Sequence, residues 1–436
     1  MKILIIGGTG ELGQWFTRFF QRLHHTVAVW GKSGKVEVAY ALGAMYAHDL
    51  DAAIHESDIV VISVPIDVTE ATIEEIAPKM SRGSLLMDMT SIKKIPLAAM
   101  EKCVPDGVEV IGTHPMFGPS IPAIRGQTVM ITPSNRCERW LPVLTDLFER
   151  EGANVEIVDA DTHDRVMAVV QGLTHFAYLS IGSTLRSLDF EVSLSRRFMS
   201  PVYEIMLDFV GRILGQNPHL YAMIQMNNSM IAEVHKAFIA ECTGLSEIVR
   251  KGSADDFTYL MKNAAAHFGD TESALRRSDK LINTKITEFE ELVRSIGRES
   301  GVLHLHSGVL HTGVIAKVAP RTIVMEEGRR SVELKIENIR LLSRAELQDW
   351  KLENLRRFTR DISVILPDRA DPSVICDVIS RCDGAVRAEV IDRYEPRRSA
   401  TFRIEILGDC DPDSVEDGIE AVLSGIGCVR RGQSAR

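Results

Sequence analysis

The chain of 436 residues is 45% hydrophobic and 25% charged, so it can bury a large core and should divide into about three domains. Its formal net charge of −10 argues against nucleic-acid binding as its main function, since such surfaces concentrate Lys and Arg. No apolar run approaches the roughly 20 residues that span a bilayer. The seven scattered cysteines lack CxxC spacing and predict neither disulfides nor a zinc site. We therefore expect a soluble, cytoplasmic protein without a metal, a membrane span or a nucleic-acid partner.

The N-terminal segment reads as strand, glycine turn, helix and strand. An apolar run at 2–6 precedes the sequence GGTGELG, an amphipathic helix pattern and a second apolar run at 26–30. This context suits the G-x-G-x-x-G fingerprint, whose glycines let the backbone approach a pyrophosphate at a helix N-terminus. Further apolar runs at 58–65 and 83–90 alternate with helical patterns, as in a buried parallel sheet. The sequence predicts a doubly wound α/β Rossmann domain over residues 1–158. The expected cofactor-binding residues are Gly8, Thr9, Gly10, Leu12, Gly13, Lys32, Ser33, Val64 and Pro65.

The end of the second strand bears on the choice of cofactor. An NAD site usually has Asp or Glu about 20 residues beyond the glycines, where it holds the ribose 2′-hydroxyl. Residues 12–36 contain no acid, and the strand ends in WGKSGK, which places Lys32, Ser33 and Lys35 where a 2′-phosphate would lie. This favours NADP over NAD, with solvated loop lysines as the alternative.

Three strand ends should face the nicotinamide: 63–65, 89–93 and the sequence GTHPMFGP. His114 stands between a strand-like run and a Pro-Met-Phe-Gly-Pro turn, so we expect regular structure to stop there. A histidine of ordinary pKa near 6.5 suits the removal of an alcohol proton. Ser91 could hydrogen-bond the same hydroxyl or orient the imidazole. A structural role for His114, in capping or packing, is the alternative.

Residues 159–296 carry long helical patterns. The stretch 162–185 is apolar nearly all round, which predicts a buried helix at a domain junction or a dimer interface. Within it, Gln171 and His175 share a face and need either neighbouring groups or a ligand to satisfy them.

A second helix should begin at Ser200, with Pro201 in its first turn, and end near Asn217. In this helix Arg212 lies four residues after Asp208. The spacing fits an ordinary helical ion pair, or an arginine that clamps a substrate carboxylate.

The C-terminal third divides again. Residues 297–356 predict a small β element or hairpin followed by a charged linker helix. Residues 357–436 read as βαββαβ, a ferredoxin-like unit similar to amino-acid-binding ACT domains and to the anticodon-binding domain of some tRNA synthetases. Regulation, dimer packing and RNA contact all remain open for this unit.

Five segments resemble the prephenate dehydrogenase family, in order, over about residues 1–290: VPIDVTEATI, MDMTSIK, GTHPMFGP, HDRVMAVVQGLTHFAYLSIG and SPVYEIMLDFVGRILGQNPHLYA. The resemblance implies NAD(P)-dependent oxidative decarboxylation of prephenate to 4-hydroxyphenylpyruvate, on the route to tyrosine. It makes His114 the base, Ser91 its neighbour and Arg212 the ligand of a substrate carboxylate. The substrate site would also include His175, Gln171, Tyr203 and His163. The family often has an acid after its second strand, which this chain lacks.

The helix that is apolar nearly all round needs more covering than its own chain supplies, which predicts a homodimer. The similarity of the last domain to ACT units makes tyrosine a possible feedback inhibitor. The lack of sequence before Met1 predicts that no chorismate mutase domain precedes the dehydrogenase. Two other functions fit the same residues. One is arogenate dehydrogenase, and the other is a non-catalytic dinucleotide-sensing regulator that would not need His114.

Overall fold

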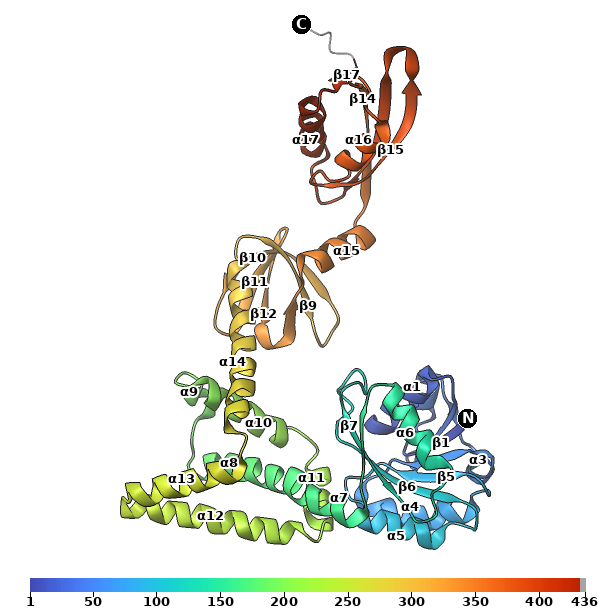
Figure 1. Ribbon diagram of the computed structural model, residues 1–436, viewed down its shortest axis with the longest axis vertical. Coiled ribbons are helices and arrows are strands. Elements are labelled where there is room, and N and C mark those ends of the chain that lie inside the picture. The colour runs from blue at the N-terminus through green and yellow to red at the C-terminus, as the bar shows by residue number, and fades with distance from the viewer. Residues whose placement is uncertain (432–436) are drawn as a thin grey trace. The chain divides into compact units, whose positions relative to one another are not determined.

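The computed structural model describes residues 1–431. The chain forms two compact units, one of residues 1–271 and one that begins at Glu272 (Figure 1). Each unit is described by itself below.

An eight-stranded sheet opens the first unit, in the order β3-β2-β1-β4-β5-β6-β7-β8. Its strands are β1 Lys2–Ile6, β2 Thr26–Trp30, β3 Met45–Tyr46, β4 Ile59–Ile62, β5 Leu85–Asp88, β6 Glu109–Pro115, β7 Thr128–Pro133 and β8 Asn154–Ile157. Neighbouring strands are parallel except β6 and β7, which are antiparallel. The predicted Rossmann-type parallel sheet is therefore confirmed, and β7 and β8 extend it beyond the strands expected from sequence.

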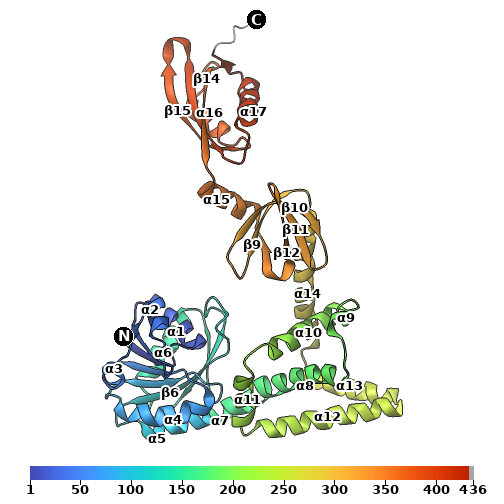
Figure 2. The same ribbon diagram turned by 180° about the vertical axis from the view of Figure 1, so that it is seen from behind.

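Helices cover both faces of this sheet, which explains why its central strands are apolar throughout. The helices are α1 Glu11–Arg22, α2 Val36–Ala41, α3 Leu50–Glu56, α4 Ile66–Ile76, α5 Lys94–Cys103 and α6 Trp140–Arg150. One core joins Ile3 and Ile5 to the aromatic side chains of α1 and α6, whereas Leu4 and Ile6 face α4 and α5. Figures 1 and 2 show these two helix pairs on opposite sides of the sheet. Alternate residues of one strand thus build two cores.

Strand β6 continues farther than the sequence predicts. It passes through His114 and Pro115, which pair with Met130 and Val129 of β7. The N–H of Met116 bonds to the carbonyl of Thr128 on β7, so the nitrogen of Pro115 faces the opposite edge. Strand β5 has already ended on that edge, so no ladder donor is missing. The expectation that regular structure stops at His114 is therefore wrong.

A helical region completes the first unit. Helices α7 Ala160–Met167 and α8 Thr174–Ser187 are joined by a π-helical turn, η2 Ala168–Leu173, and are followed by α9 Val192–Ser195, α10 Pro201–Leu214, α11 Pro218–Asn227, α12 Ile231–Lys251 and α13 Ala254–Phe268. Helix α10 begins as predicted, with the Ser200 hydroxyl accepting from the backbone N–H of Tyr203. It ends at Leu214 rather than near Asn217, because Asn217 instead caps α11.

The apolar helix expected to be buried is only partly covered by its own chain. Its first part buries His163, Met167 and Gly172, whereas every residue of α8 is at least partly exposed and Leu179 is 50% exposed. The continuous helix Ala160–Ser187 is also long and apolar enough, by length and composition, to cross a membrane. The expectation that no apolar run reaches that length is therefore wrong. A helix whose apolar surface packs against other helices has the same length and composition, so this feature alone does not identify a membrane span.

The second unit contains α14 Thr271–Arg294, most of which lies beyond the boundary, and two antiparallel sheets. The first has five strands in the order β12-β11-β10-β9-β13, more than the predicted hairpin. Its strands are β9 Glu299–His304, β10 Leu310–Val318, β11 Thr322–Glu327, β12 Arg330–Lys335 and β13 Ile339–Leu341. Helix α15 Arg344–Asn354 follows, with a capping box of Ser343 and Glu346.

The last sheet has four strands in the order β15-β16-β14-β17. Its elements in chain order are β14 Arg357–Ile365, α16 Pro372–Ile379, β15 Ala385–Tyr394, β16 Ser399–Leu407, α17 Pro412–Gly425 and β17 Val429–Arg430. Phe402 and Ile404 of β16 lie in a core shared with Ile375 and Ile419 of the two helices. The succession of elements is the βαββαβ that the sequence indicates.

We expect Gly13→Ala to disturb the glycine turn, because a Cβ there would lie 2.4 Å from the carbonyl oxygen of Gly7 and 2.7 Å from Cα of Gly8. Both are backbone atoms, so relief requires the turn to move. The free energy of unfolding should fall by about 1–3 kcal/mol, and dinucleotide affinity should fall with it. Urea denaturation and a fluorescence titration with NADP measure these effects. Gly418→Ala is the control, since nothing lies within 4 Å of a Cβ there. Equal behaviour of the two variants would contradict the prediction.

Candidate active site

The glycine turn lies at the carboxyl ends of β1 and β4. The N–H of Gly10 bonds to the carbonyl of Gly7, and a Cβ on Gly7 would meet the Ser63 carbonyl at 2.1 Å and Val64 at 3.1 Å. The turn is therefore tight and lies directly against the end of β4, as predicted for Val64. Pro65 follows as the N-cap of α4. Gly10 is the N-cap of α1 and gives no side-chain hydrogen bond, so the first N–H groups of that helix can serve a phosphate.

The loop after β2 lies beside the same turn. A Cβ on Gly31 would approach the Thr9 hydroxyl oxygen to 2.4 Å, which places Thr9 against the start of the loop. Lys32 and Ser33 follow and are exposed, while Leu12 is half-buried on α1. The structure thus brings the predicted cofactor-binding residues to one edge of the sheet, in a cradle that extra Cβ atoms would fill.

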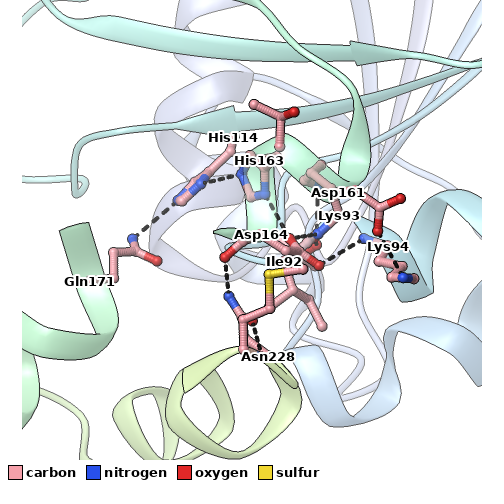
Figure 3. Close-up of polar contacts among 12 residues, drawn as sticks. Ile92, Lys93, Lys94, His114, Asp161, His163, Asp164, Gln171 and Asn228 are labelled. Carbon is pink, nitrogen blue, oxygen red and sulfur yellow. Dashed lines mark hydrogen bonds and ion pairs between the residues drawn. The ribbon is translucent and has the colours of Figure 1, made fainter. Parts of the chain in front are cut away.

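His114 is buried and belongs to a series of hydrogen bonds, which we call the Asp–His–His series: Asp164, His163 and His114. Nδ1 of His114 lies 3.0 Å from Nε2 of His163, and Nδ1 of His163 lies 2.7 Å from Oδ1 of Asp164 (Figure 3). Nε2 of His114 lies 3.3 Å from Nε2 of Gln171. The imidazole of His114 is thus held at both nitrogens.

The direction of these bonds assigns the proton positions. The Asp164 carboxylate accepts, so Nδ1 of His163 carries a proton and Nε2 of the same ring accepts. Nδ1 of His114 must then donate to His163, which leaves a lone pair on Nε2 of His114. The series therefore holds His114 in the tautomer that can receive a proton at Nε2.

Asp164 also joins the helical region of the first unit to the domain that contains the eight-stranded sheet. Its carboxylate accepts from the backbone N–H groups of Lys93, at 2.8 Å, and Lys94, at 3.1 Å, at the start of α5. The Asn228 amide donates to the backbone carbonyl of Asp164 at 2.6 Å. Sequence reasoning missed Asp164, although its place beside His163 in the sequence HDR was a usable signal.

Lys93 was also missed, and it forms a fully buried ion pair with Asp88 at the end of β5. Thr90 donates to the same carboxylate through its N–H and its hydroxyl. Burial lowers the pKa of Lys93, while the charge of Asp88 opposes that shift. Asp88 and Lys93 flank the loop that carries Ser91.

Burial is also the main cause of the pKa shifts in the two series histidines. It lowers the pKa of His114 well below 6.5, and the charges of His163 and Lys93 lower it further. Burial lowers the pKa of His163 as well, although the hydrogen bond to Asp164 opposes this. At neutral pH both rings are therefore uncharged, as the assigned tautomers require.

A second group of side chains lies around His175, and it includes Tyr221, which sequence reasoning missed. The His175 ring contacts that of Tyr221 with centroids 4.3 Å apart, and the Tyr221 hydroxyl donates to Gln216 at 3.1 Å. Burial lowers the pKa of His175 to about 4, and Nδ1 of His175 is buried without a partner among the described residues. Burial raises the pKa of Tyr221 and the nearby positive charge of Arg212 lowers it. Arg212 itself is exposed.

Two other predicted residues lie outside these contacts. Ser91 is half-buried in the loop after β5, and the His114 ring is oriented by His163 and Gln171 rather than by Ser91. The other role expected of Ser91, hydrogen bonding to a substrate hydroxyl, stays a prediction. Tyr203 lies in the first turn of α10 and is half-buried. The Asp208 carboxylate pairs with Arg196 at 3.6 Å, so this acid has a partner outside α10.

Comparison with known proteins identifies the family. Residues 16–157 match the nucleotide-binding domain of prephenate dehydrogenase, and residues 159–263 match its dimerization domain. A Methanocaldococcus jannaschii protein described as a probable arogenate/prephenate dehydrogenase is 38% identical over 439 residues, covering 98% of each chain. The chain belongs to the prephenate dehydrogenase family. It is therefore a dehydrogenase.

Other prephenate dehydrogenase relatives match a shorter part of the chain. The T-protein of Haemophilus influenzae is 30% identical over 290 residues, which are 64% of this chain and 71% of that protein. The crystal structure of prephenate dehydrogenase from A. aeolicus, in complex with hydroxyphenyl propionate and NAD+, superposes with a TM-score of 0.52 at 18% identity. It covers 62% of this chain and 98% of that one, and it supports the fold assignment of the first unit.

We expect the dehydrogenase to keep its activity at mildly acidic pH. His114 accepts a proton only when neutral, and burial lowers its pKa well below 6.5. As pH falls, kcat/KM should therefore decline only below pH 6.5, through the depressed pKa of this base. A pH series of initial rates at low substrate, with cofactor binding measured at each pH, tests this. An acid limb centred at or above pH 6.5, with cofactor binding intact, would contradict it.

Proposed function

We propose that the enzyme catalyses the NAD(P)-dependent oxidative decarboxylation of prephenate to 4-hydroxyphenylpyruvate. The Asp–His–His series carries this proposal, because it ends in an unprotonated Nε2 at the carboxyl edge of a dinucleotide-binding sheet. Oxidation of a ring alcohol needs a base at that edge. A lone structural histidine would need no such directed series.

In the proposed reaction, Nε2 of His114 removes the proton of the ring hydroxyl. A nicotinamide held at the glycine turn would supply the acceptor for the hydride on the carbon that carries this hydroxyl. The O–H electron pair becomes the second bond of the C=O group. Loss of carbon dioxide then returns an electron pair through the ring to this oxygen, which takes the proton back from His114 as the ring becomes aromatic. His163 and Asp164 stabilise the imidazolium that forms on His114, since its Nδ1 proton remains bonded to His163.

The surroundings of His175 favour prephenate over arogenate. Prephenate has two carboxylates and a keto group, and it suits a cation such as Arg212 and a neutral donor such as Tyr221. Arogenate replaces the keto group by an ammonium, which calls for a carboxylate beside it. Arogenate remains the second candidate, because the M. jannaschii relative is named for both substrates.

For the cofactor we propose NADP. Lys32 and Ser33 lie exposed in the loop that Thr9 contacts, and β2 is followed by no acid that would bind a free ribose 2′-hydroxyl. A 2′-phosphate there would lie beside a positively charged lysine, whereas the acid of an NAD site would repel it.

We further propose that the enzyme is a homodimer inhibited by tyrosine. The match to a dimerization domain and the uncovered apolar surface of α8 support the dimer. The C-terminal βαββαβ unit would be the place where tyrosine acts, by its similarity to amino-acid-binding domains.

The reaction is tested by the initial rate of reduced-nicotinamide formation, with prephenate or arogenate and with NAD or NADP. We expect the fastest rate with prephenate and NADP. His114→Asn should lower kcat by about 10²- to 10⁴-fold with substrate and cofactor binding nearly unchanged. Gln348→Asn, on the exposed face of α15, serves as a control. A regulator that only senses dinucleotide would bind the cofactor without turnover, and an arogenate dehydrogenase would turn over only the second substrate.

The dimer is tested by sedimentation at micromolar concentration. We expect a dimer that Leu179→Glu dissociates, because a charge on the uncovered face of α8 cannot be desolvated cheaply. A folded monomer in the unchanged protein would contradict the proposal.

A further inference from the structure

Gln171 lies at an irregular position in an otherwise continuous helix. The π-helical turn η2, Ala168–Leu173, interrupts the helix between α7 and α8. Such turns leave backbone groups that need other partners, and they often occur at functional sites. Here the Gln225 amide donates to the carbonyl of Gly172 at 3.1 Å, and Gly172 packs so closely on Ile231 that a Cβ would approach it to 2.8 Å. The turn is thus held in place from two sides.

This turn directs the Gln171 side chain toward Nε2 of His114, the nitrogen that carries the lone pair (Figure 3). Because Nε2 of His114 carries a lone pair, the amide must present its N–H there and not its oxygen. The oxygen, Oε1, is buried and has no hydrogen-bond partner among residues 1–431. Buried polar atoms normally have partners, so Gln171 is not held in place by hydrogen bonds at both ends of its amide, and its N–H end is the one that faces His114.

Resting on the function proposed above, we infer that Gln171 donates a hydrogen bond to the reacting oxygen of the substrate. The two nitrogens are 3.3 Å apart, and an oxygen about 2.8 Å from each completes a triangle without moving either group. The hydroxyl oxygen then donates its proton to His114 and accepts from Gln171. No other described side chain lies within hydrogen-bond distance of this nitrogen of His114.

The hydrogen bond strengthens as the reaction proceeds. When the O–H bond breaks, the proton moves to Nε2 of His114, the C=O bond forms and hydride leaves for the nicotinamide. Loss of carbon dioxide then sends an electron pair through the ring toward this same oxygen. Two donors face the oxygen at that stage, the new N–H of His114 and the N–H of Gln171. Donors placed where negative charge develops lower the barrier of the chemical step more than they improve ground-state binding.

The test replaces Gln171 by Met, which keeps the length of the side chain and removes the amide. We expect kcat to fall on the order of 10²-fold while the dissociation constants of prephenate and NADP change less than threefold. Gln348→Met, the same substitution at an exposed position of α15, should match the unchanged enzyme. Equal kcat for Gln171→Met and the unchanged enzyme would overturn the inference, as would a loss seen only in KM.

A second variant, Gln171→Glu, keeps the size of the side chain and covers the case in which the Met variant does not fold. The carboxylate would accept from His114 and favour its protonated form, so the acid limb of kcat/KM should move to higher pH as kcat falls. That shift of the limb would show only that the variant folds with its side chain beside His114, and an unchanged kcat at a pH above the shifted limb would overturn the inference. If the unchanged enzyme turned over neither prephenate nor arogenate, the proposed function itself would fail, and the role of Gln171 with it.

Discussion

The carboxylate of Asp164 is the group on which the arrangement of the site depends. It accepts hydrogen bonds from two backbone N–H groups at the start of α5 and from the ring of His163. The first contacts fix helix α7 against the nucleotide-binding sheet, and the last fixes the tautomer of both histidines. One negative charge, placed where a helix N-terminus stabilises it, therefore sets both the junction of the nucleotide-binding sheet with the helical region and the tautomer of His114.

Burial has opposite consequences for the groups that surround this carboxylate. It keeps His114 and His163 neutral, which makes a base available at Nε2. Burial also removes the Lys93–Asp88 ion pair from water, and this costs free energy unless each charge has a partner. Lys93 links these effects, because its backbone N–H holds Asp164 while its charge lowers the pKa of His114. The position of this buried lysine thus helps to set the pKa of the His114 ring.

The sequence predicts what depends on local pattern and misses what depends on distant contacts. The glycine turn, the continuous apolar strands and the start of α10 at Ser200 each follow from neighbouring residues. The extension of β6 through Pro115 depends on where β5 ends, and the roles of Asp164 and Lys93 depend on residues about seventy positions apart. The π-helical turn that directs Gln171 is held by Gln225 and Ile231 from other helices. Helical spacing alone therefore placed Gln171 and His175 together, whereas the structure points one at His114 and the other at Tyr221.

The uncovered surface of α8 connects assembly to the site. This helix carries His175, and Gly182 on it packs so closely against α10 that a Cβ would approach Leu214 to 2.8 Å. Helix α10 carries Arg212, so the arginine that would bind a substrate carboxylate and the histidine of the same proposed site lie on helices packed directly together. Covering the apolar face of α8 would restrict the motion of both, because a close backbone contact transmits displacement from one helix to the other. A subunit interface on α8 would therefore keep His175 and Arg212 at a fixed distance from His114. The position of His114 needs no such interface, because β6 of the nucleotide-binding sheet holds it.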